Sequence, residues 1–245
     1  MKLHAQLTTV CALDERRREQ MFALMDQYYA GMKREVFEVD LREKRWVIQL
    51  IDAQTQALRG FSTQMLLERQ IDGKPARALF SGDTIVDRGC WGQSLLAQAW
   101  GHLALSLIDA HPNEFLYWFL ISKGYKTYRF LPVFFREFYP RFDRPTPSWA
   151  ARIIDAFARE KFPGSYDSSG GVIRAAAASG RLRQGVAQVT VERLSDPHVR
   201  FFVERNPNHA LGEELCCIAP LTRENFTAAA KRPLRCEGPN WSVVS

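Results

Sequence analysis

The sequence predicts a mixed α/β (α+β) fold: an antiparallel meander of three strands, then a parallel strand pair, flanked by helices and followed by a C-terminal extension. Three β-rich runs follow one another with short polar turns between them, which is typical of an antiparallel meander. A long amphipathic segment then separates the third run from a continuous apolar run. A helix between two strands of one sheet makes those strands parallel, with a right-handed crossover.

The first predicted element is a helix within residues 13–32, because Met21, Leu24, Met25 and Tyr28 recur at helical spacing. Asp14 stands where a helix-capping residue is expected, and the helix should end near Gly31. The meander follows, with strands at Trp46–Ile51, Leu58–Glu68 and Arg77–Val86 and turns at Gln54–Gln56 and Asp72-Gly73.

A long helix is predicted after the third strand, because Leu95, Leu96, Ala99, Trp100, Leu103 and Leu107 form one apolar stripe. Phe115–Ile121 is a continuous apolar run, as expected of a strand that is buried on both faces. A second helix should begin within Lys123–Tyr139, with Pro132 near its start or interrupting it.

A change of character near residues 143–148 divides the chain into a core of residues 1–145 and an extension of residues 146–245. In the extension, helices are expected at Ser148–Phe162 and Asn225–Lys231, and strands at Val186–Val191, Val199–Glu204 and Glu214–Ala219. Such short strands are marginally stable alone. We therefore expect the extension to pack on the core and to join the sheet beside Phe115–Ile121.

The composition, with 46% hydrophobic and 24% charged residues among 245, is that of a folded soluble protein. No apolar run reaches the length of a membrane span, and the first residues carry too many charges for a secretion signal. The five cysteines form no C-x-x-C pair, and the histidines have no metal-ligand spacing. The prediction is a cytoplasmic protein with reduced thiols, no metal and no membrane partner.

The net charge of +6 favours an anionic partner. Lys123–Arg144 is the most basic segment, and its basic residues alternate with aromatic ones. That pattern suits a nucleic acid, but the simpler interpretation places the aromatic side chains in the core and the charges in solvent. A phosphate-bearing cofactor or carrier fits the charge equally well, so nucleic acid is the less favoured partner.

The most informative segment, residues 78–110, is a strand, a turn with two glycines and a long helix. A helix N-terminus presents unpaired N–H groups and a positive dipole end, which bind phosphate groups. The turn reads Asp87-Arg88-Gly89-Cys90-Trp91-Gly92, followed by Gln93-Ser94-Leu95-Leu96. We expect the amides of Gly89–Gln93 to hold a phosphate or pyrophosphate.

Over residues 10–142 the element order resembles the GNAT superfamily of N-acyltransferases, in which a turn patterned Gln/Arg-x-x-Gly-x-Gly/Ala holds the pyrophosphate of an acyl-CoA. If Gly92 takes the last glycine position, the two helix leucines align, but Cys90 and Asp87 replace a glycine and a Gln or Arg. Alternatively, Arg88-Gly89 matches the opening of the motif in a shorter turn. The resemblance implies acetyl-CoA or another acyl-CoA as donor, bound by Arg88, Gly89, Cys90, Trp91, Gly92 and Gln93.

The resemblance also implies that the strands before and after the turn splay apart around the thioester. Backbone N–H groups around Thr84, Ile85 and Val86 would hold its carbonyl. Asp83 would then be the base, although a strand-edge residue bonded to nearby backbone is the alternative interpretation. Tyr128 lies near the position of the tyrosine acid of the family, with Tyr125 one helical turn away, and either one could instead be a packing residue.

The favoured hypothesis is an N-acyltransferase that transfers an acyl group from acyl-CoA, or from an acyl carrier protein, to an amine by direct attack. One alternative is a non-catalytic GNAT-fold protein that binds an acyl thioester or a partner. A nucleic-acid-binding module that uses Lys123–Arg144 is the third. The sequence does not identify the acceptor amine.

Overall fold

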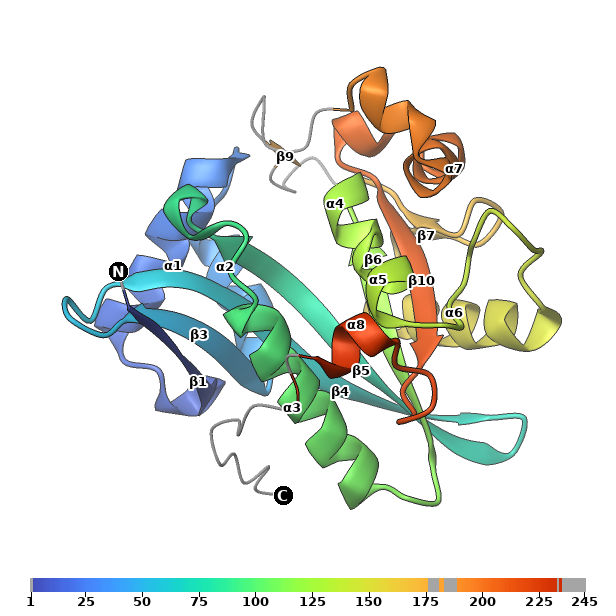
Figure 1. Ribbon diagram of the computed structural model, residues 1–245, viewed down its shortest axis with the longest axis horizontal. Coiled ribbons are helices and arrows are strands. Elements are labelled where there is room, and N and C mark those ends of the chain that lie inside the picture. The colour runs from blue at the N-terminus through green and yellow to red at the C-terminus, as the bar shows by residue number, and fades with distance from the viewer. Residues whose placement is uncertain (1, 176–180, 183–188, 233, 235–245) are drawn as a thin grey trace.

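The computed structural model describes residues 2–175, 181–182, 189–232 and 234 (Figure 1). Its strands are β1 (Leu3–Thr9), β2 (Tyr29–Ala30), β3 (Trp46–Asp52), β4 (Leu58–Ile71), β5 (Lys74–Val86), β6 (Phe115–Ser122), β7 (Tyr166–Asp167), β8 (Val172–Ile173), β9 (Arg181–Leu182) and β10 (Glu214–Pro220). The α-helices are α1 (Glu15–Tyr28), α2 (Arg34–Glu43), α3 (Leu95–Ala110), α4 (Tyr125–Tyr128), α5 (Phe130–Phe134), α6 (Ser148–Lys161), α7 (Pro197–Arg205) and α8 (Ala228–Lys231). Short 3-10 helices are η1 (Val10–Ala12), η2 (Arg88–Cys90), η3 (Glu192–Ser195) and η4 (His209–Leu211).

Within the described residues, one eight-stranded sheet has the order β1-β3-β4-β5-β6-β10-β8-β7. β5 and β6 are parallel and the other neighbours are antiparallel. β2 and β9 form a separate antiparallel pair. The predicted fold class is confirmed: a three-strand meander, β3-β4-β5, leads into a parallel pair joined by α3. This is the order of strands and helices that the sequence predicts.

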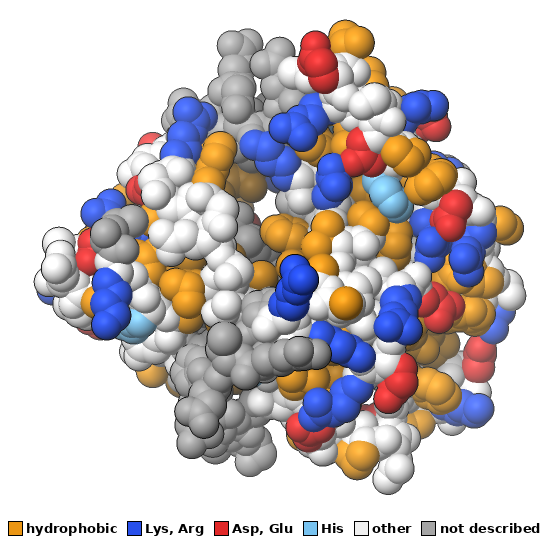
Figure 2. Space-filling model, viewed as in Figure 1, with side chains coloured by type: hydrophobic (Ala, Val, Ile, Leu, Met, Phe, Trp, Pro, Cys, Tyr) orange, Lys and Arg blue, Asp and Glu red, His pale blue; other side chains and the backbone are white. Residues whose placement is uncertain are grey.

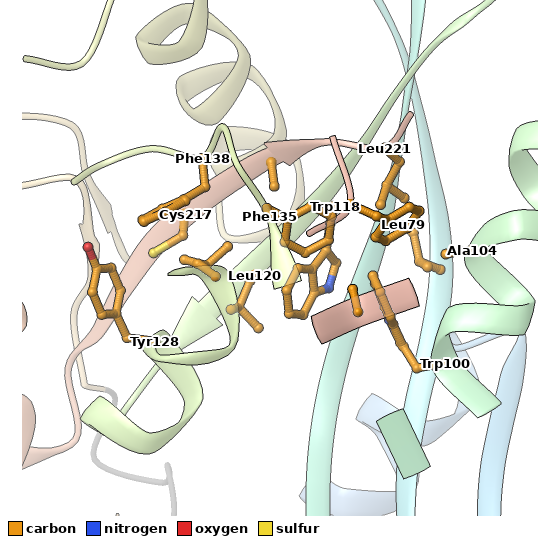
Figure 3. Close-up of a cluster of buried hydrophobic side chains, with 14 of the residues drawn as sticks. Leu79, Trp100, Ala104, Trp118, Leu120, Tyr128, Phe135, Phe138, Cys217 and Leu221 are labelled. Carbon is orange, nitrogen blue, oxygen red and sulfur yellow. The ribbon is translucent and has the colours of Figure 1, made fainter. Parts of the chain in front are cut away.

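Helices cover both faces of the sheet (Figure 1). The α3 face carries a buried cluster built from α3, α4, α5, α7 and α8 against β5, β6 and β10. Figure 3 shows part of this cluster, with Trp100 from α3 packed beside Trp118 of β6. The opposite face, here the α1 face, carries two clusters, one under α1 and α2 and one under α6. The site described below lies at the point where β5 and β6 stop pairing, between the helices that cover the two faces of the sheet.

The elements predicted in the first half are confirmed, and the structure adds others, among them β1, β2 and α2. Asp14 caps α1, because its side chain accepts a hydrogen bond of 2.7 Å from the amide of Arg17. The Asp72-Gly73 turn joins β4 to β5 with both residues at positive φ, 51° and 73°, as hairpin turns require. The sequence did not predict β1 or α2.

The extension contains the predicted helix, α6, and the strand β10 pairs with β6 at the predicted sheet edge. The strand predicted at Val199–Glu204 is wrong, because this segment lies in α7. Asp196 caps that helix by accepting from the amide of His198, and Pro197 occupies its first turn. Of the strand predicted at Val186–Val191, residues 186–188 lie outside the described residues.

The helical segment predicted within Lys123–Tyr139 is present as two short helices, α4 and α5, and Pro132 lies near the start of α5. Most of the aromatic side chains of this segment are buried, as the simpler interpretation of the basic segment requires: Tyr125, Tyr128, Phe135, Phe138 and Tyr139. No helix in the described ranges is long and apolar enough to cross a bilayer.

Candidate functional site

The sheet divides where β5 and β6 stop pairing. Their parallel register runs from Ala76↔Phe115 to Ser81↔Leu120, after which β5 continues to Val86 paired to β4 alone. We call the space between residues 82–86 of β5 and the end of β6 with α4 the splay. Figure 2 shows the surface hollowed between the turn after β5 and α4.

A β-bulge forms the β5 side of the splay. Ser62 of β4 is opposite Thr84, but Gln64 is opposite Ser81, so Gly82 and Asp83 share one partner residue. A bulge adds a residue to one strand and turns its side chains away from the regular alternation. Asp83 is therefore the side chain that the bulge presents at the splay.

A buried polar network fixes the point at which the strands divide. The hydroxyl of Ser81 accepts hydrogen bonds from the indole N–H groups of Trp100, at 3.1 Å, and Trp118, at 3.0 Å. The Ser81 hydroxyl then donates to Oε1 of Gln64 at 2.8 Å. Because Trp100 is on α3 and Trp118 is on β6, one side chain ties β5 to both elements that bound the splay.

The network continues into the bulge. Nε2 of Gln64 donates to Oγ of Ser62 at 2.7 Å, and Ser62 is 2.7 Å from Oγ1 of Thr84. Thr84 in turn donates to the carbonyl of Gly82 at 3.3 Å. A buried network whose members are all hydrogen-bonded is rigid, so the bulge that carries Asp83 is held in place.

The carboxyl of Asp83 is half-buried and has a perturbed pKa. Loss of hydration, followed by the negative charge of Asp40, raises the pKa of Asp83 to about 6, while Lys44 and Lys123 oppose the shift. A base is most effective when its pKa lies near the working pH. The shift brings the pKa of Asp83 toward the range in which a carboxyl serves as a general base.

Lys44 lies directly beneath the bulge. Its side chain is buried, and its ammonium contacts the carboxylate of Asp40 at 2.6 Å and donates to the backbone carbonyl of Asp40 at 3.0 Å. A Cβ on Gly82 would lie 2.8 Å from Cε of Lys44 and 2.6 Å from Oγ1 of Thr63. Glycine at position 82 therefore lets Lys44 pass close to the bulge.

The structure brings three further side chains to Asp83 that the sequence reasoning missed. The ammonium of Lys123, just after β6, lies 3.4 Å from the carboxylate of Glu214 and 5.4 Å from the ring centroid of Tyr29. Burial, together with the charges of Asp83 and Glu214, raises the pKa of Tyr29 well above its usual range. These residues come from distant segments, so no local motif could have indicated them.

The backbone of β5 turns two N–H groups toward the splay. The amide of Asp87 donates to the carbonyl of Arg59 on β4 at 2.8 Å. Because alternate residues of a strand point their N–H and C=O groups to opposite sides, Thr84 and Val86 face away from β4. The carbonyl of Val86 accepts 2.8 Å from the indole N–H of Trp91. The N–H groups of Thr84 and Val86 therefore point toward the splay, and the N–H of Ile85 points toward β4. Of the three residues expected to hold a carbonyl, only Thr84 and Val86 have an N–H in the right direction.

The expected phosphate cradle at Gly89–Gln93 requires a correction. The amides of Gly89, Cys90, Trp91 and Gln93 donate within the turn, to Asp87, to Arg88 or to Cys90. The amide of Arg88 donates to the hydroxyl of Tyr28 at 2.8 Å. The 3-10 turn therefore uses these groups internally, and a left-handed Gly92, with φ of +88°, redirects the chain into α3.

The first turn of α3 has backbone N–H groups that the helix itself does not use. The amide of Gln98 makes the first intrahelical bond, to Ser94, and Ser94 makes no side-chain cap bond to the helix amides. The preceding first-turn amides, at Leu95, Leu96 and Ala97, are the orphan donors that every helix start has. These amides, a few residues after the predicted cradle, have the geometry that suits an anion.

Tyr128 does not face the splay, which corrects its expected role as the acid. Its side chain is fully buried, and its hydroxyl donates to the carbonyl of Pro140 at 2.9 Å. Tyr139, next to that proline, pairs with Ile218 of β10, so the hydroxyl is directed toward β10 and away from β5. Figure 3 shows Tyr128 beside Phe138 and Cys217 within the apolar cluster. Tyr125 is buried in the same cluster.

Cys90 and the possible metal ligands are the remaining reactive groups to consider. Cys90 is buried, and loss of hydration followed by Asp87 raises the pKa of its thiol, which disfavours the thiolate. Among the described residues, no group of three or more His, Cys, Asp or Glu side chains could hold a metal ion.

A scan of protein-family models gives no match, and a search of curated proteins gives none. Among solved structures, the chain is similar to AtaT complexed with acetyl-methionyl-tRNAfMet, with 14% identity over 53% of this chain and 83% of that chain and a TM-score of 0.37. It is similar to glucosamine-6-phosphate N-acetyltransferase from Arabidopsis thaliana, with 12% identity over 49% and 82% of the two chains and a TM-score of 0.36. It is also similar to the GNAT family N-acetyltransferase YhbS from Escherichia coli in complex with CoA, with 16% identity over 50% and 65% and a TM-score of 0.36.

Proposed function

We propose that the chain is an acyl-CoA-dependent N-acyltransferase in which an amine attacks the thioester directly. The observation that carries the proposal is the splay itself. On one strand it combines a half-buried carboxyl whose pKa is near 6, Asp83, with backbone N–H groups at Thr84 and Val86. Acyl transfer needs a base for the amine and donors for the oxyanion, held on a rigid frame.

Each residue has a defined task in this proposal. Asp83 accepts the proton of the attacking amine, and the N–H groups of Thr84 and Val86 stabilise the negative charge on the acyl oxygen. Lys44 and Lys123 limit the rise of the Asp83 pKa, so that the carboxyl is ionised at neutral pH. Tyr29 keeps its proton because its raised pKa makes the phenol a weak acid, and the departing CoA thiolate takes its proton from solvent.

The donor fits the end of the splay next to α3. The orphan amides of the first turn of α3 suit the pyrophosphate of a CoA thioester, because a helix N-terminus binds phosphate groups. Arg88 and Lys126 add positive charge beside this turn. The acyl group would then reach the splay along β5.

Release of free thiol from acetyl-CoA in the presence of an amine library tests this function directly. We expect turnover with at least one amine, and Asp83→Asn should abolish most of it while donor binding persists. Glu35→Gln, a change of the same charge at an exposed position of α2, is the matched control. Donor binding without thiol release for any amine would favour the non-catalytic thioester-binding alternative.

A further inference from the structure

Two lysine side chains meet one aspartate beneath the bulge, and one of the two lysines belongs to the extension. The ammonium of Lys161, the last residue of α6, lies 3.7 Å from Oδ1 of Asp40 on α2, and the ammonium of Lys44 lies 2.6 Å from the same oxygen. Lys161 also forms an ion pair with Glu43. We call Asp40, Lys44 and Lys161 the lysine clamp.

The lysines of the clamp are buried, unlike those of an ordinary surface ion pair. The side chains of Lys44 and Lys161 are 1% and 9% exposed. An ammonium that leaves water loses its hydration, so it needs a carboxylate in good geometry beside it. By contrast, Arg152 of α6 and Asp72 are 53% and 64% exposed, and such a pair contributes little. The two buried ammonium groups therefore fix the Asp40 carboxylate between them.

The lysine clamp contacts the strand that carries Asp83. The ammonium groups of Lys44 and Lys161 lie 5.8 Å and 5.9 Å from the ring centroid of Phe80, a fully buried residue of β5. An aromatic ring attracts cations at such distances. Cε of Lys44 also lies 2.8 Å from the place where a Cβ on Gly82 would be. The clamp therefore meets β5 at Phe80 and at Gly82, directly before the base.

The carboxyl of Asp83 is faced by titratable and charged groups from several segments. They are Asp40 of α2, Lys44 after α2, Lys123 after β6, Glu214 of β10 and Tyr29 of β2. After the loss of hydration, the negative charge of Asp40 contributes most to the raised pKa of Asp83, and Lys44 opposes it. Because Lys161 contacts Asp40, it acts on Asp83 through the carboxylate to which Asp83 responds most strongly.

We propose that Lys161 is a positioning residue for Asp83: from the extension, it holds Asp40 beside Lys44 beneath the bulge and balances the charge that Asp40 places near the base. This inference rests on the proposed function, in which Asp83 is the base. Without Lys161, Asp40 keeps its negative charge with one cation fewer beside it, which favours the protonated form of Asp83. The extension then contributes to the site as well as to the sheet.

An NMR titration of the Asp83 carboxyl carbon in the full chain tests the inference, with Asp83→Asn to assign the signal. We expect the titration midpoint, about 6 in wild type, to rise by about half a unit to one unit in Lys161→Met. Methionine keeps an apolar side chain against Phe80 and removes the charge. Lys161→Arg keeps the charge and should keep the wild-type midpoint.

A second background tests the route through Asp40. Asp40→Asn should lower the midpoint, because it removes the negative neighbour that raises the pKa of Asp83 most. In that background Lys161→Met should cause no further rise, since a residue that acts through Asp40 has no effect once Asp40 is neutral. Arg152→Met, at an exposed position of the same helix, makes the same change of net charge and should leave the midpoint as in wild type.

In acylation assays the pH at which kcat/KM reaches half its maximum should move with the NMR midpoint in every variant. A midpoint that neither Lys161→Met nor Asp40→Asn changes would overturn the inference and leave the proposed function standing. An equal rise for Lys161→Met in the Asp40→Asn background would overturn the route through Asp40. Absence of acylation with every amine, together with the expected NMR shifts, would refute the proposed function and leave the effect of Lys161 on the carboxyl standing.

Discussion

Asp83 carries the sharpest prediction for a single residue. As a base it must be ionised, so kcat/KM should rise with pH through about 6 and then level off. Asp83→Asn should lower turnover by roughly a hundred- to ten-thousandfold. A pH–rate profile with no step near pH 6, or a variant that keeps wild-type turnover, would remove Asp83 from the mechanism.

The same carboxyl should reduce the stability of the folded chain at neutral pH. Its folded pKa, about 6, lies above the ordinary value of 3.8, so folding favours the protonated form. The contribution of this carboxyl to the free energy of unfolding is therefore most favourable below pH 4. That contribution is lost as the pH rises through 6. Asp83→Asn should raise the free energy of unfolding at pH 8 by about 1–2 kcal/mol, a value reduced for partial solvent exposure. Denaturation at pH 8 and at pH 4 measures it, and the gain should vanish at pH 4.

Tyr128 should behave as a structural residue. Removing its hydroxyl leaves the carbonyl of Pro140 without its donor in a buried place, which costs about 1–2 kcal/mol. Tyr128→Phe is therefore expected to lower the melting temperature by a few degrees and to leave turnover within about twofold of wild type. A tenfold loss of turnover at unchanged stability would return Tyr128 to the mechanism.

At the scale of elements, Ser81 should be the residue that joins β5, β6 and α3. Ser81→Ala leaves two indole N–H groups without an acceptor and Gln64 without a donor, at a cost of about 2–4 kcal/mol. Denaturation and the two indole N–H signals in NMR spectra measure this effect. Ser106→Ala on α3 removes a hydroxyl that bonds only its own helix, and it should change stability by less than about 0.5 kcal/mol. Indole signals that Ser81→Ala leaves in place would contradict the network.

Elements whose hydrophobic residues recur with a clear helical or strand periodicity could be predicted from the sequence. Elements whose hydrophobic periodicity is ambiguous could not. The runs of β3, β4 and β5 alternate or are continuously apolar, and α3 has a full apolar stripe. By contrast, Val199–Glu204 is rich in β-branched and aromatic residues, which suit a strand. The segment forms the helix α7 instead, because Asp196 caps the helix and a proline at its first position favours a helix start.

The candidate site was predictable only in the part that one segment supplies. The strand–turn–helix pattern indicated the turn after β5, and the resemblance, which places a base on the preceding strand, indicated Asp83. Tyr29 of β2, Lys44 just after α2 and Glu214 of β10 come from distant segments that only the folded chain brings to Asp83. The role of Tyr128 was inferred from its position relative to the tyrosine of the resembled family, which gives a place along the chain but not the direction in which the side chain is buried.

At the scale of the whole molecule, residues 1–145 and 146–245 differ in sequence character, but we expect that neither part is stable without the other. β10 pairs along β6 from Leu215↔Ser122 to Pro220↔Tyr117, so the core without it would expose the edge of a strand buried on both faces. An unpaired apolar edge strand promotes aggregation.

The extension depends on the core in the same way. α6 buries Ile153, Ile154 and Phe157 in the cluster that it shares with β5 and β6. α7 buries Val199 and Phe202 in the cluster that contains Tyr128. Alone, neither helix has a surface on which to bury its apolar side.

We therefore expect that residues 1–145 and 146–245, expressed separately, each fail to give a soluble fragment with a cooperative thermal transition. Co-expression of the two should recover a complex that melts as one unit, because the pairing of β10 with β6 and the packing of α6 and α7 restore both buried layers. Circular dichroism melts and gel filtration of the separate and co-expressed fragments measure this. Two soluble fragments with independent transitions would show that the extension is a domain in its own right, joined to the sheet but not required for it.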